Sequence, residues 1–460
     1  MIDEIVQVQQ GLLRGRTGHH PQVRVFRGIP YAAAPVGNLR WRKPQPAPAW
    51  EGVREAADYG SRCWQFPRLG SASFFAREFT MKTVRPLPEL PQSEDCLFLN
   101  VWTSAQSADD RLPVVVSIHG GAFCTGTGAE GQLERENLCL RGAVVVSFNY
   151  RLGVLGFLAH PALADEAGDY GNYGMYDQIA AIRWVRDNIA AFGGDPDRIT
   201  LLGGSAGGLS AEVLNCSPLT AGLYRRAILQ SSGGIELSRG EAEQAAREFV
   251  ALLGTEDAAQ LRALPVEAIV HAYLLSNYTI NRDQRHLWVP TVDGTLLPDF
   301  CKTIIQSGGM HDLDYLFGVN RDDMDIPEMF EMARTWAQAQ ARPGRKNAYF
   351  YYFDRRMPGD DPAAFAYHGV ESWYLYDMVA ENWRNLGQED QQLSERMQAY
   401  WSNFIATGNP NGEGLPAWEA YEAEKPGVLR LGLAPRMDER IDPTDGEECP
   451  HVPWVKSNYQ

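Results

Sequence analysis

The chain has 460 residues, with 58 acidic and 42 basic side chains and a formal net charge of −16. Hydrophobic residues make up 44% of the chain and charged residues 22%, which excludes a mainly disordered protein. The negative charge opposes binding to the phosphate backbone of nucleic acids and to anionic membranes. Length alone leaves the number of domains open, because a large α/β enzyme can fold as one unit.

The first residues, Met1 to Glu4, are acidic where a secretory signal is basic, and no apolar stretch has membrane-spanning length. We therefore expect a cytoplasmic protein with no membrane insertion. The seven cysteines are too sparse for a disulfide scaffold, and they form no C-x-x-C pair of the kind found in zinc sites. We expect most of them to be buried thiols.

Short apolar runs alternate with helical patterns along the chain. The predicted strands, which are rich in β-branched or aromatic residues, cover 114–118, 144–148, 199–202, 227–230, 315–317 and 348–353. Apolar residues recur at helical spacing over 177–192 and again over 393–405. This alternation predicts an α/β fold with a mostly parallel central sheet. Because no linker or internal repeat divides the chain, we expect a single domain over residues 1–460.

A G-x-S-x-G motif, Gly203 to Gly207, directly follows the third predicted strand. Such a motif places a nucleophilic serine on a sharp turn from a strand to a helix, where a Cβ two residues to either side would collide with the backbone. Gly203 and Gly207 meet this requirement. The alternative is a glycine-rich packing turn with a capping serine. The strand in front of the motif favours Ser205 as a nucleophile.

A serine hydroxyl needs a base and an orienting acid, which in this class of fold follow the nucleophile in the order acid, then histidine. The loop after the fifth predicted strand contains Asp322 and Asp323. Two histidines remain downstream. We assign the base to His368, which follows the last predicted strand, rather than to His451, which lies between prolines in the terminal segment. The alternative is that His368 is a surface-loop histidine without a partner.

The segment His119 to Phe123, His-Gly-Gly-Ala-Phe, follows the first predicted strand. It therefore lies at the carboxyl edge of the sheet, where ligands bind in open α/β folds. Glycines at this place let backbone N–H groups approach a reacting carbonyl. We predict an oxyanion hole that is formed by the amides of Gly121, Ala122 and Ala206. The alternative is a tight turn at the exit of a strand.

Together these motifs resemble the type-B carboxylesterase family, which includes bacterial carboxylesterases and the cholinesterases. The resemblance runs through most of the chain and includes the segments 26–32, 93–100, 149–151, 192–196, 290–294 and 400–404. It implies a serine carboxylesterase on an α/β-hydrolase fold, with helices on both faces of the sheet. The triad positions of the family fall on Ser205, Asp323 and His368, and its oxyanion positions on Gly121, Ala122 and Ala206.

Two departures from the family pattern concern the site itself. Gly204 stands where the family usually has a glutamate, so one active-site carboxylate is missing. The acid of the family usually lies in a D-E-G sequence, whereas here Asp322 and Asp323 are followed by a methionine. Because aspartate is one methylene shorter than glutamate, Asp322 and Asp325 stay possible substitutes for Asp323.

Other departures concern the surroundings of the site. The connection from Asp323 to His368 is short, which predicts a reduced helical region between 324 and 348 and a wider mouth to the site. A helix over 327–341 could instead close that space. In the stretch where cholinesterases carry a tryptophan for quaternary ammonium groups, this chain has Phe74, Phe75 and Phe79, which we interpret as loop core or pocket wall.

Cys63 and Cys96 occupy positions that resemble a family disulfide. Such a bond would stabilise the fold by about 3 kcal/mol on loop-entropy grounds, but a reducing cytoplasm opposes it. We therefore expect free thiols in the cell.

The predicted reaction is hydrolysis of a small-molecule carboxylic ester in two steps through a covalent acyl-enzyme, without a cofactor or a metal. The same groups acting on amides, thioesters or lactones are one alternative. A non-catalytic, esterase-like binding protein is another. The acyl and alcohol specificity stays open, as does the oligomeric state, for which we expect a monomer or a weak dimer.

Overall fold

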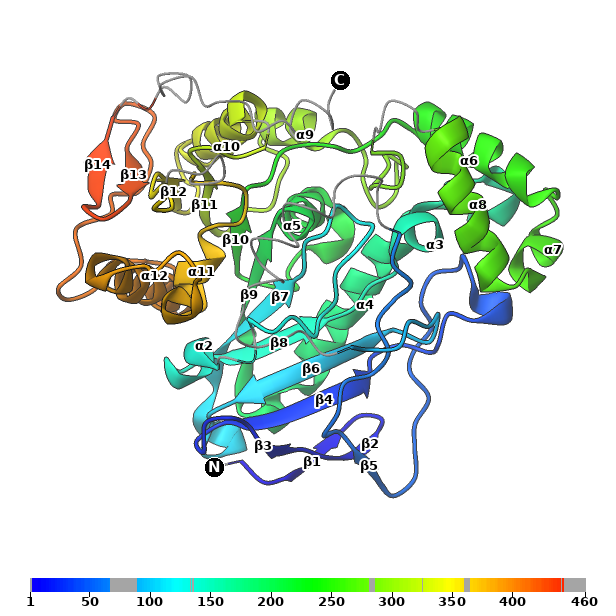
Figure 1. Ribbon diagram of the computed structural model, residues 1–460, viewed down its shortest axis with the longest axis horizontal. Coiled ribbons are helices and arrows are strands. Elements are labelled where there is room, and N and C mark those ends of the chain that lie inside the picture. Colours follow the sequence, from blue (N-terminus) through cyan, green and yellow to red (C-terminus); the bar gives the residue numbers. More distant parts are fainter. Residues whose placement is uncertain are drawn as a thin grey trace.

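A mixed sheet of eleven described strands runs through the computed structural model, in the order β14-β13-β12-β11-β10-β9-β7-β8-β6-β4-β3 (Figure 1). The structure describes residues 2–66, 89–132, 134, 136–280, 286–324, 326–359, 365–439 and 441. The strands of this sheet are β3 (Arg16–Thr17), β4 (Arg24–Pro30), β6 (Phe98–Thr103), β7 (Leu112–Ile118), β8 (Val144–Phe148), β9 (Gly194–Gly204), β10 (Arg226–Gln230), β11 (Asp314–Asn320), β12 (Ala348–Phe353), β13 (Val428–Leu431) and β14 (Arg436–Asp438). A separate small sheet contains β1 (Ile5–Val8), β2 (Gly11–Arg14) and β5 (Val53–Glu55).

The strands from β8 to β13 in this order pair in parallel, and the strands at both edges pair antiparallel. The mostly parallel sheet predicted from the apolar runs is therefore confirmed. Strands β8 and β12 have the predicted bounds, whereas β9 and β11 extend beyond the predicted 199–202 and 315–317.

Helices connect and cover the strands. They are α2 (Asn137–Leu140), α3 (Gly153–Phe157), α4 (Tyr173–Asn188), α5 (Ala206–Cys216), α6 (Arg239–Leu253), α7 (Ala258–Ala263), α8 (Val266–Thr279), α9 (Cys301–Ser307), α10 (Ile326–Gln340), α11 (Ser372–Leu375) and α12 (Gln388–Thr407). The predicted helix over 177–192 begins earlier, at Tyr173, and its last residues form the 3-10 turn η6 (Ile189–Phe192). No helix in the described ranges has the length and apolar character needed to cross a membrane.

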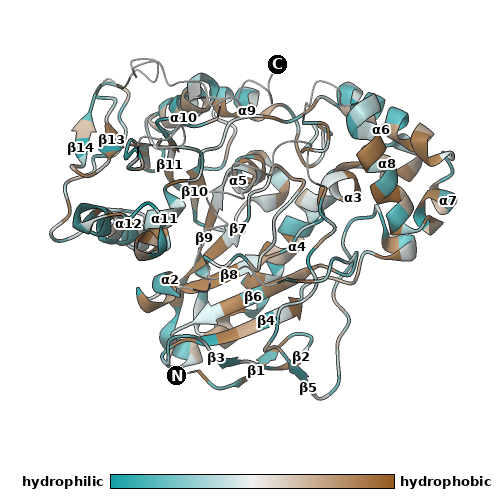
Figure 2. Cartoon of the chain, in the orientation of Figure 1, coloured by the Kyte–Doolittle hydropathy of each residue, from teal (hydrophilic) through white to brown (hydrophobic). Residues whose placement is uncertain are grey.

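Side chains alternate between two hydrophobic cores, one on each face of the sheet. On β7, Val114, Val116 and Ile118 belong to a core that also contains residues of α4, α5 and α10. Val115 belongs to the other core, together with residues of α11 and α12. Because successive residues of a strand point to opposite faces, this alternation requires helices on both faces of the sheet. Figure 2 shows the resulting hydrophobic character of central strands such as β6 and β8.

The direction of the chain reverses at β7. From β7 the chain continues to β8 on one side, and then crosses to β9 on the other side of β7. The carboxyl ends of β7 and β9 are therefore neighbours whose connections leave in opposite directions. This arrangement opens a crevice at the edge of an α/β sheet, which is the usual place for a ligand. The segment His119 to Phe123 follows β7, and the motif Gly203 to Gly207 begins at the end of β9.

Helix α10 occupies the region after the predicted acid, where the sequence allowed a helix over 327–341. An added Cβ at Gly233 would lie 3.2 Å from Met329 Cγ, and one at Gly234 would lie 3.2 Å from Met332 Cε. The methionines of α10 thus pack on the chain that follows β10. Whether this helix narrows the mouth of the site stays a prediction, as does the single domain over 1–460. Phe74, Phe75 and Phe79 lie outside the described residues.

Cys63 and Cys96, which we predict to be free thiols in the cell, lie side by side. Their Sγ atoms lie 2.7 Å apart and both side chains are buried. Burial raises the pKa of the Cys96 thiol. Because we predict a reducing environment, we expect both thiols to be alkylated when cells are lysed in alkylating reagent and to pair after exposure to air. Mass spectrometry of the two peptides, with Cys139 as a buried control thiol, checks this. A bond already present in freshly alkylated protein would contradict it.

Candidate active site

Ser205 lies in a strained turn between β9 and α5. Its backbone has φ 57° and ψ −129°, a conformation that residues with a Cβ rarely adopt. The Ser205 amide donates a hydrogen bond to the Gln230 carbonyl at 2.9 Å, and the Ser205 carbonyl accepts one from the Leu209 amide at 2.9 Å. The predicted turn from a strand to a helix is confirmed, and the side chain is half-buried at its tip.

The glycines on either side of this turn are required by backbone contacts. A Cβ at Gly203 would lie 2.1 Å from the Gly207 carbonyl oxygen, and a Cβ at Gly207 would lie 2.0 Å from the Ile118 carbonyl oxygen. By contrast, the nearest atom to an added Cβ at Gly204 is Gln230 Cβ, at 3.9 Å. The missing carboxylate at position 204 therefore has no steric cause in the backbone.

Asp323 and His368 are in contact. His368 Nδ1 makes a hydrogen bond with Asp323 Oδ1, and both side chains are buried. Asp323 Oδ2 accepts a hydrogen bond from Ser231 Oγ at 2.5 Å and another from the Asn320 amide at 3.0 Å. These donors hold the carboxylate in one orientation. The acid and base that the sequence predicted are thus brought together by the loops after β11 and β12.

The neighbouring aspartates differ in position. Asp322 Oδ2 accepts a hydrogen bond from the Ala366 amide at 2.9 Å, and Asp322 lies 3.8 Å from the Arg356 guanidinium. It therefore joins two loops and does not contact His368 in the described hydrogen bonds. The other substitute, Asp325, lies outside the described residues, as does His451.

The charges of this pair shift both pKa values. Burial by itself raises the pKa of Asp323, but the charge of His368 and the hydrogen bonds from His368, Ser231 and Asn320 bring it below its ordinary value. Burial by itself lowers the pKa of His368, but the Asp323 carboxylate and the charge of Glu371 bring it above its ordinary value. The site therefore holds an ionised acid beside a histidine whose protonated form is stabilised.

Four polar residues near this pair had no role in the prediction from the sequence: Ser231, Glu371, Asn320 and Gln230. Ser231 follows β10 directly and donates to Asp323. Glu371 is buried, and its carboxylate accepts hydrogen bonds from Asn320 Nδ2 at 2.5 Å and from Gln230 Nε2 at 3.3 Å. Burial raises the pKa of Glu371 to about 7. Gln230 and Asn320 end β10 and β11, and Ser231 follows β10 directly, so the shared edge of parallel strands was the available signal for these three. Glu371 lies after β12, directly before α11, and carried no such signal.

Hydrogen bonds connect the turn at Ser205 to Asp323. The Ser205 amide bonds to Gln230, and the amide of the next residue, Ser231, bonds to the Gly318 carbonyl of β11 at 2.8 Å. The Ser231 hydroxyl then reaches Asp323. Ser205, Ser231 and Asp323 therefore follow three neighbouring strands, β9, β10 and β11.

The predicted oxyanion loop passes beside Ser205. A Cβ at Gly120 would lie 3.2 Å from Ser205 Cβ and 3.8 Å from Ser205 Oγ, so only a residue without a side chain leaves this approach open. Gly121 has φ 105° and Ala122 has φ 55°. The Gly121 carbonyl accepts hydrogen bonds from the amides of Cys124 and Thr125, both at 2.9 Å. The chain thus turns sharply after β7, and Ala206 begins α5 immediately after the serine.

The buried side chain of His119 packs beneath the start of this loop, between Tyr150 and the Gly120 carbonyl. Its ring stacks on Tyr150 with centroids 4.4 Å apart, and Nδ1 makes a hydrogen bond with the Gly120 carbonyl at 2.8 Å. Burial lowers the pKa of His119 to about 4, so the ring is neutral near pH 7. It acts as a packing residue for the turn.

In the described part of the chain, one group of acidic and thiol side chains is close enough to hold a metal ion. It contains Glu212, Glu236 and Cys301. None of the residues predicted for catalysis belongs to it.

The sequence matches the Carboxylesterase family over residues 2–342 and 327–447. It is 31% identical to the para-nitrobenzyl esterase of Bacillus subtilis (strain 168), over 94% of this chain and 95% of that protein. It is also 31% identical to the cocaine esterase of Homo sapiens, over 91% of this chain and 85% of that protein. A solved PNB esterase structure superposes with a TM-score of 0.84 at 30% identity, covering 95% of this chain and 97% of that one. A carboxylesterase from Geobacillus stearothermophilus superposes with a TM-score of 0.81 at 28% identity, with all of both chains covered.

The family match, the relatives and the solved structures agree with the family resemblance of the sequence motifs. The chain therefore belongs to the carboxylesterase family and is a carboxylic ester hydrolase with the α/β-hydrolase fold.

Proposed function

We propose that this chain hydrolyses carboxylic esters through a covalent acyl-enzyme formed on Ser205, with His368 as the base and Asp323 as the orienting acid. The observation that carries this proposal is the buried contact between Asp323 and His368, braced by Ser231. The strained turn at Ser205 ends the neighbouring strand β9 and supports the role of this serine. The substrate is a small-molecule ester, and the reaction needs no cofactor.

In the first step His368 accepts the proton of Ser205 as Oγ attacks the ester carbonyl. Asp323 keeps Nδ1 of the imidazole protonated and offsets the positive charge that develops on the ring. The amides of Gly121, Ala122 and Ala206 stabilise the negative charge on the carbonyl oxygen. His368 then gives its proton to the departing alcohol. Water repeats these steps to release the acid and restore Ser205.

Removal of the nucleophile tests this mechanism. Ser205→Ala should lower kcat by about 10⁴-fold or more, because the acyl-enzyme cannot form, while the fold is retained. Because the Bacillus relative is named a para-nitrobenzyl esterase, hydrolysis of a para-nitrobenzyl ester is a suitable assay. Ser307→Ala, which removes an exposed hydroxyl at the end of α9, is the matched control. A fluorophosphonate probe should label the unaltered chain and not Ser205→Ala. Equal labelling of both would contradict the assignment, and failure to label either would favour a non-catalytic protein.

A comparison of two adjacent aspartates tests the acid. Asp323→Asn should lower kcat by about 10⁴-fold, because the imidazole loses the partner that holds its tautomer. Asp322→Asn removes only the carboxylate that faces Ala366 and should keep most of the activity. Steady-state kinetics of both variants, with circular dichroism to verify the fold, checks this. If Asp322→Asn carries the larger loss, the wrong carboxylate has been assigned.

The pH dependence of kcat/KM should report the charge around His368. A base must be neutral to accept a proton, so activity falls as the pH falls through the pKa of His368. Because Asp323 and Glu371 bring that pKa above its ordinary value despite burial, this acidic limb should lie above the ordinary pKa of histidine. Glu371→Gln removes one nearby charge and should move the limb to lower pH. Glu248→Gln, on the exposed face of α6, should leave it in place. An unmoved limb in Glu371→Gln would contradict this view of the site.

A series of esters with rising acyl bulk and a constant leaving group tests the mouth of the site. The short connection after Asp323 predicts an open mouth, so kcat/KM should be retained for bulky acids, and discrimination among substrates should be low. A collapse of kcat/KM beyond small acyl chains would mean that α10 closes the site. Matched esters and amides in the same assay would identify an amidase.

A further inference from the structure

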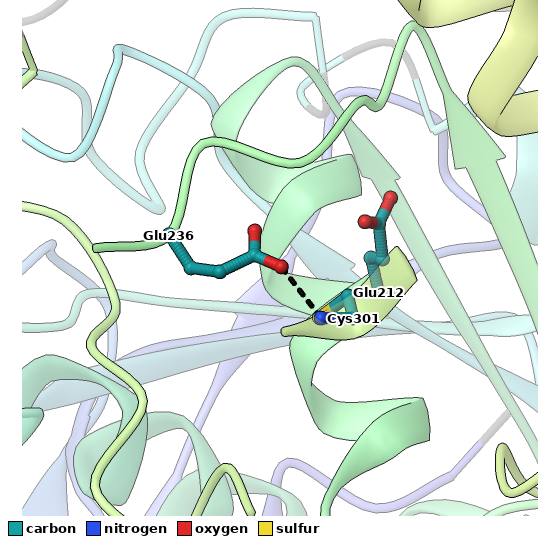
Figure 3. A group of neighbouring side chains, drawn as sticks. All are labelled: Glu212, Glu236 and Cys301. Carbon is teal, nitrogen blue, oxygen red and sulfur yellow. Dashed lines mark hydrogen bonds between the residues drawn. The ribbon is translucent and has the colours of Figure 1, made fainter. Parts of the chain in front are cut away.

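Three side chains with metal-binding chemistry meet where α5, the loop after β10 and the start of α9 come together (Figure 3). They are Glu212 on α5, Glu236 in the loop, and Cys301, the first residue of α9. One potential ligand atom of each lies within 4.8 Å of the other two. Glu236 Oε1 accepts a hydrogen bond from the Cys301 amide at 2.6 Å, which holds this carboxylate beside the thiol.

Within this cluster, Glu212 has a buried carboxylate whose charge no hydrogen bond from the described residues offsets. The residue is 1% exposed, and neither of its carboxylate oxygens accepts a hydrogen bond from the described residues. The Ser232 hydroxyl and the Trp336 indole are polar neighbours, but neither donates a well-formed hydrogen bond. Burial, and then the charge of Glu236, raise the pKa of Glu212 well above its ordinary value. A buried carboxylate in such surroundings needs either a proton or a cation.

Among the ion pairs of the described residues, none joins Glu212 or Glu236 to a lysine, arginine or histidine. A second thiol, Cys216 at the end of α5, interacts with Cys301. The potential ligands of the cluster are thus carboxylate oxygens and a thiol sulfur on three separate elements, all within 4.8 Å of one another.

This donor set selects the type of cation. Mg²⁺ and Ca²⁺ take oxygen ligands, whereas thiolate favours a softer ion. Zn²⁺ binds cysteine sulfur and glutamate oxygen in sites with four ligands. Two carboxylates and one thiolate supply three ligands, and Cys216 or a water can complete the fourth. A dipositive ion would also offset the charge that burial leaves uncompensated.

We propose that Glu212, Glu236 and Cys301 form a binding site for Zn²⁺. The ion would join the nucleophile helix α5 to α9 and to the loop after β10, and its role is structural. No step of the proposed acyl transfer uses this ion. The proposal is independent of the proposed role of Ser205, because Ser205→Ala leaves all three ligands in place.

Metal binding by the full chain tests the proposal. The protein is purified without a metal-affinity tag, stripped with a chelator and incubated with Zn²⁺ alone. Elemental analysis after gel filtration should find one zinc per chain, and Zn²⁺ should raise the melting temperature. Co²⁺ should give the absorption band of a cobalt–thiolate bond. Ser205→Ala should behave in the same way, so that the test does not depend on catalysis.

Variants of the ligands decide the site. Cys301→Ser and Glu212→Gln should each weaken zinc binding by at least about 100-fold, since each loses a direct ligand. Cys301→Ser should also weaken the cobalt–thiolate band, because it removes the sulfur ligand of the cluster. Cys139→Ser, another buried thiol, and Glu248→Gln, an exposed glutamate, should bind as the unaltered chain does. If Glu212→Gln does not fold, Glu236→Gln, which changes a half-buried side chain, provides the same measurement. Zinc binding that is absent from the unaltered chain, or that persists in Cys301→Ser, would overturn the proposal.

Discussion

Close contact between backbones at the carboxyl edge of the sheet is the constraint on which the site depends. The exit of β7, the end of β9 and the first turn of α5 approach so closely that Gly203 and Gly207 leave no room for a Cβ. Ser205 is therefore held at φ 57°, a conformation that costs about 1 to 3 kcal/mol and persists only where neighbours fix it. The neighbours are the paired strands β7, β9 and β10, whose hydrogen bonds resist relaxation of the turn. Rigid strands thus hold a strained, half-buried serine at the carboxyl edge of the sheet.

The buried carboxyl groups of this acidic protein are found in two situations. Asp323 and Glu371 are buried, but amides, a hydroxyl and an imidazole meet their oxygens. Glu212 is also buried, and its oxygens accept no hydrogen bond from the residues that the structure describes. Because a buried charge without partners is costly, the second situation points to a proton or a bound cation. In the first situation, the hydrogen-bond donors and the imidazole stabilise the buried carboxylates.

The turn at Ser205 and the acidic cluster share one helix, α5. Ser205 precedes α5, and Glu212 and Cys216 lie further along it. Anything that ties the far part of α5 to α9 would also restrain the helix that begins directly after Ser205. The packing of α10 methionines on Gly233 and Gly234 brings a third element to the same side of the sheet. The region after β10 therefore contacts the site, the acidic cluster and α10.

Much of the fold and part of the site could be predicted from the residues alone, because both rest on local patterns. Continuous apolar runs mark strands that are buried on both faces, and all six predicted strands are present. The G-x-S-x-G motif specifies its own turn, since the glycines that it requires are adjacent in the chain. The order of acid and histidine along the chain then left few candidates for the remaining roles.

Tertiary structure decided what depends on contacts between distant segments. Asp322 and Asp323 are indistinguishable by type and position in the sequence, but neighbouring side chains in a loop point in different directions, and only Asp323 meets His368. Ser231 and Glu371 gained their places through the ends of β10 and β11. Glu212, Glu236 and Cys301 carry no common motif. They meet because three separate elements cross at one point of the packed chain, and the spacing of residues along a sequence does not encode such a crossing.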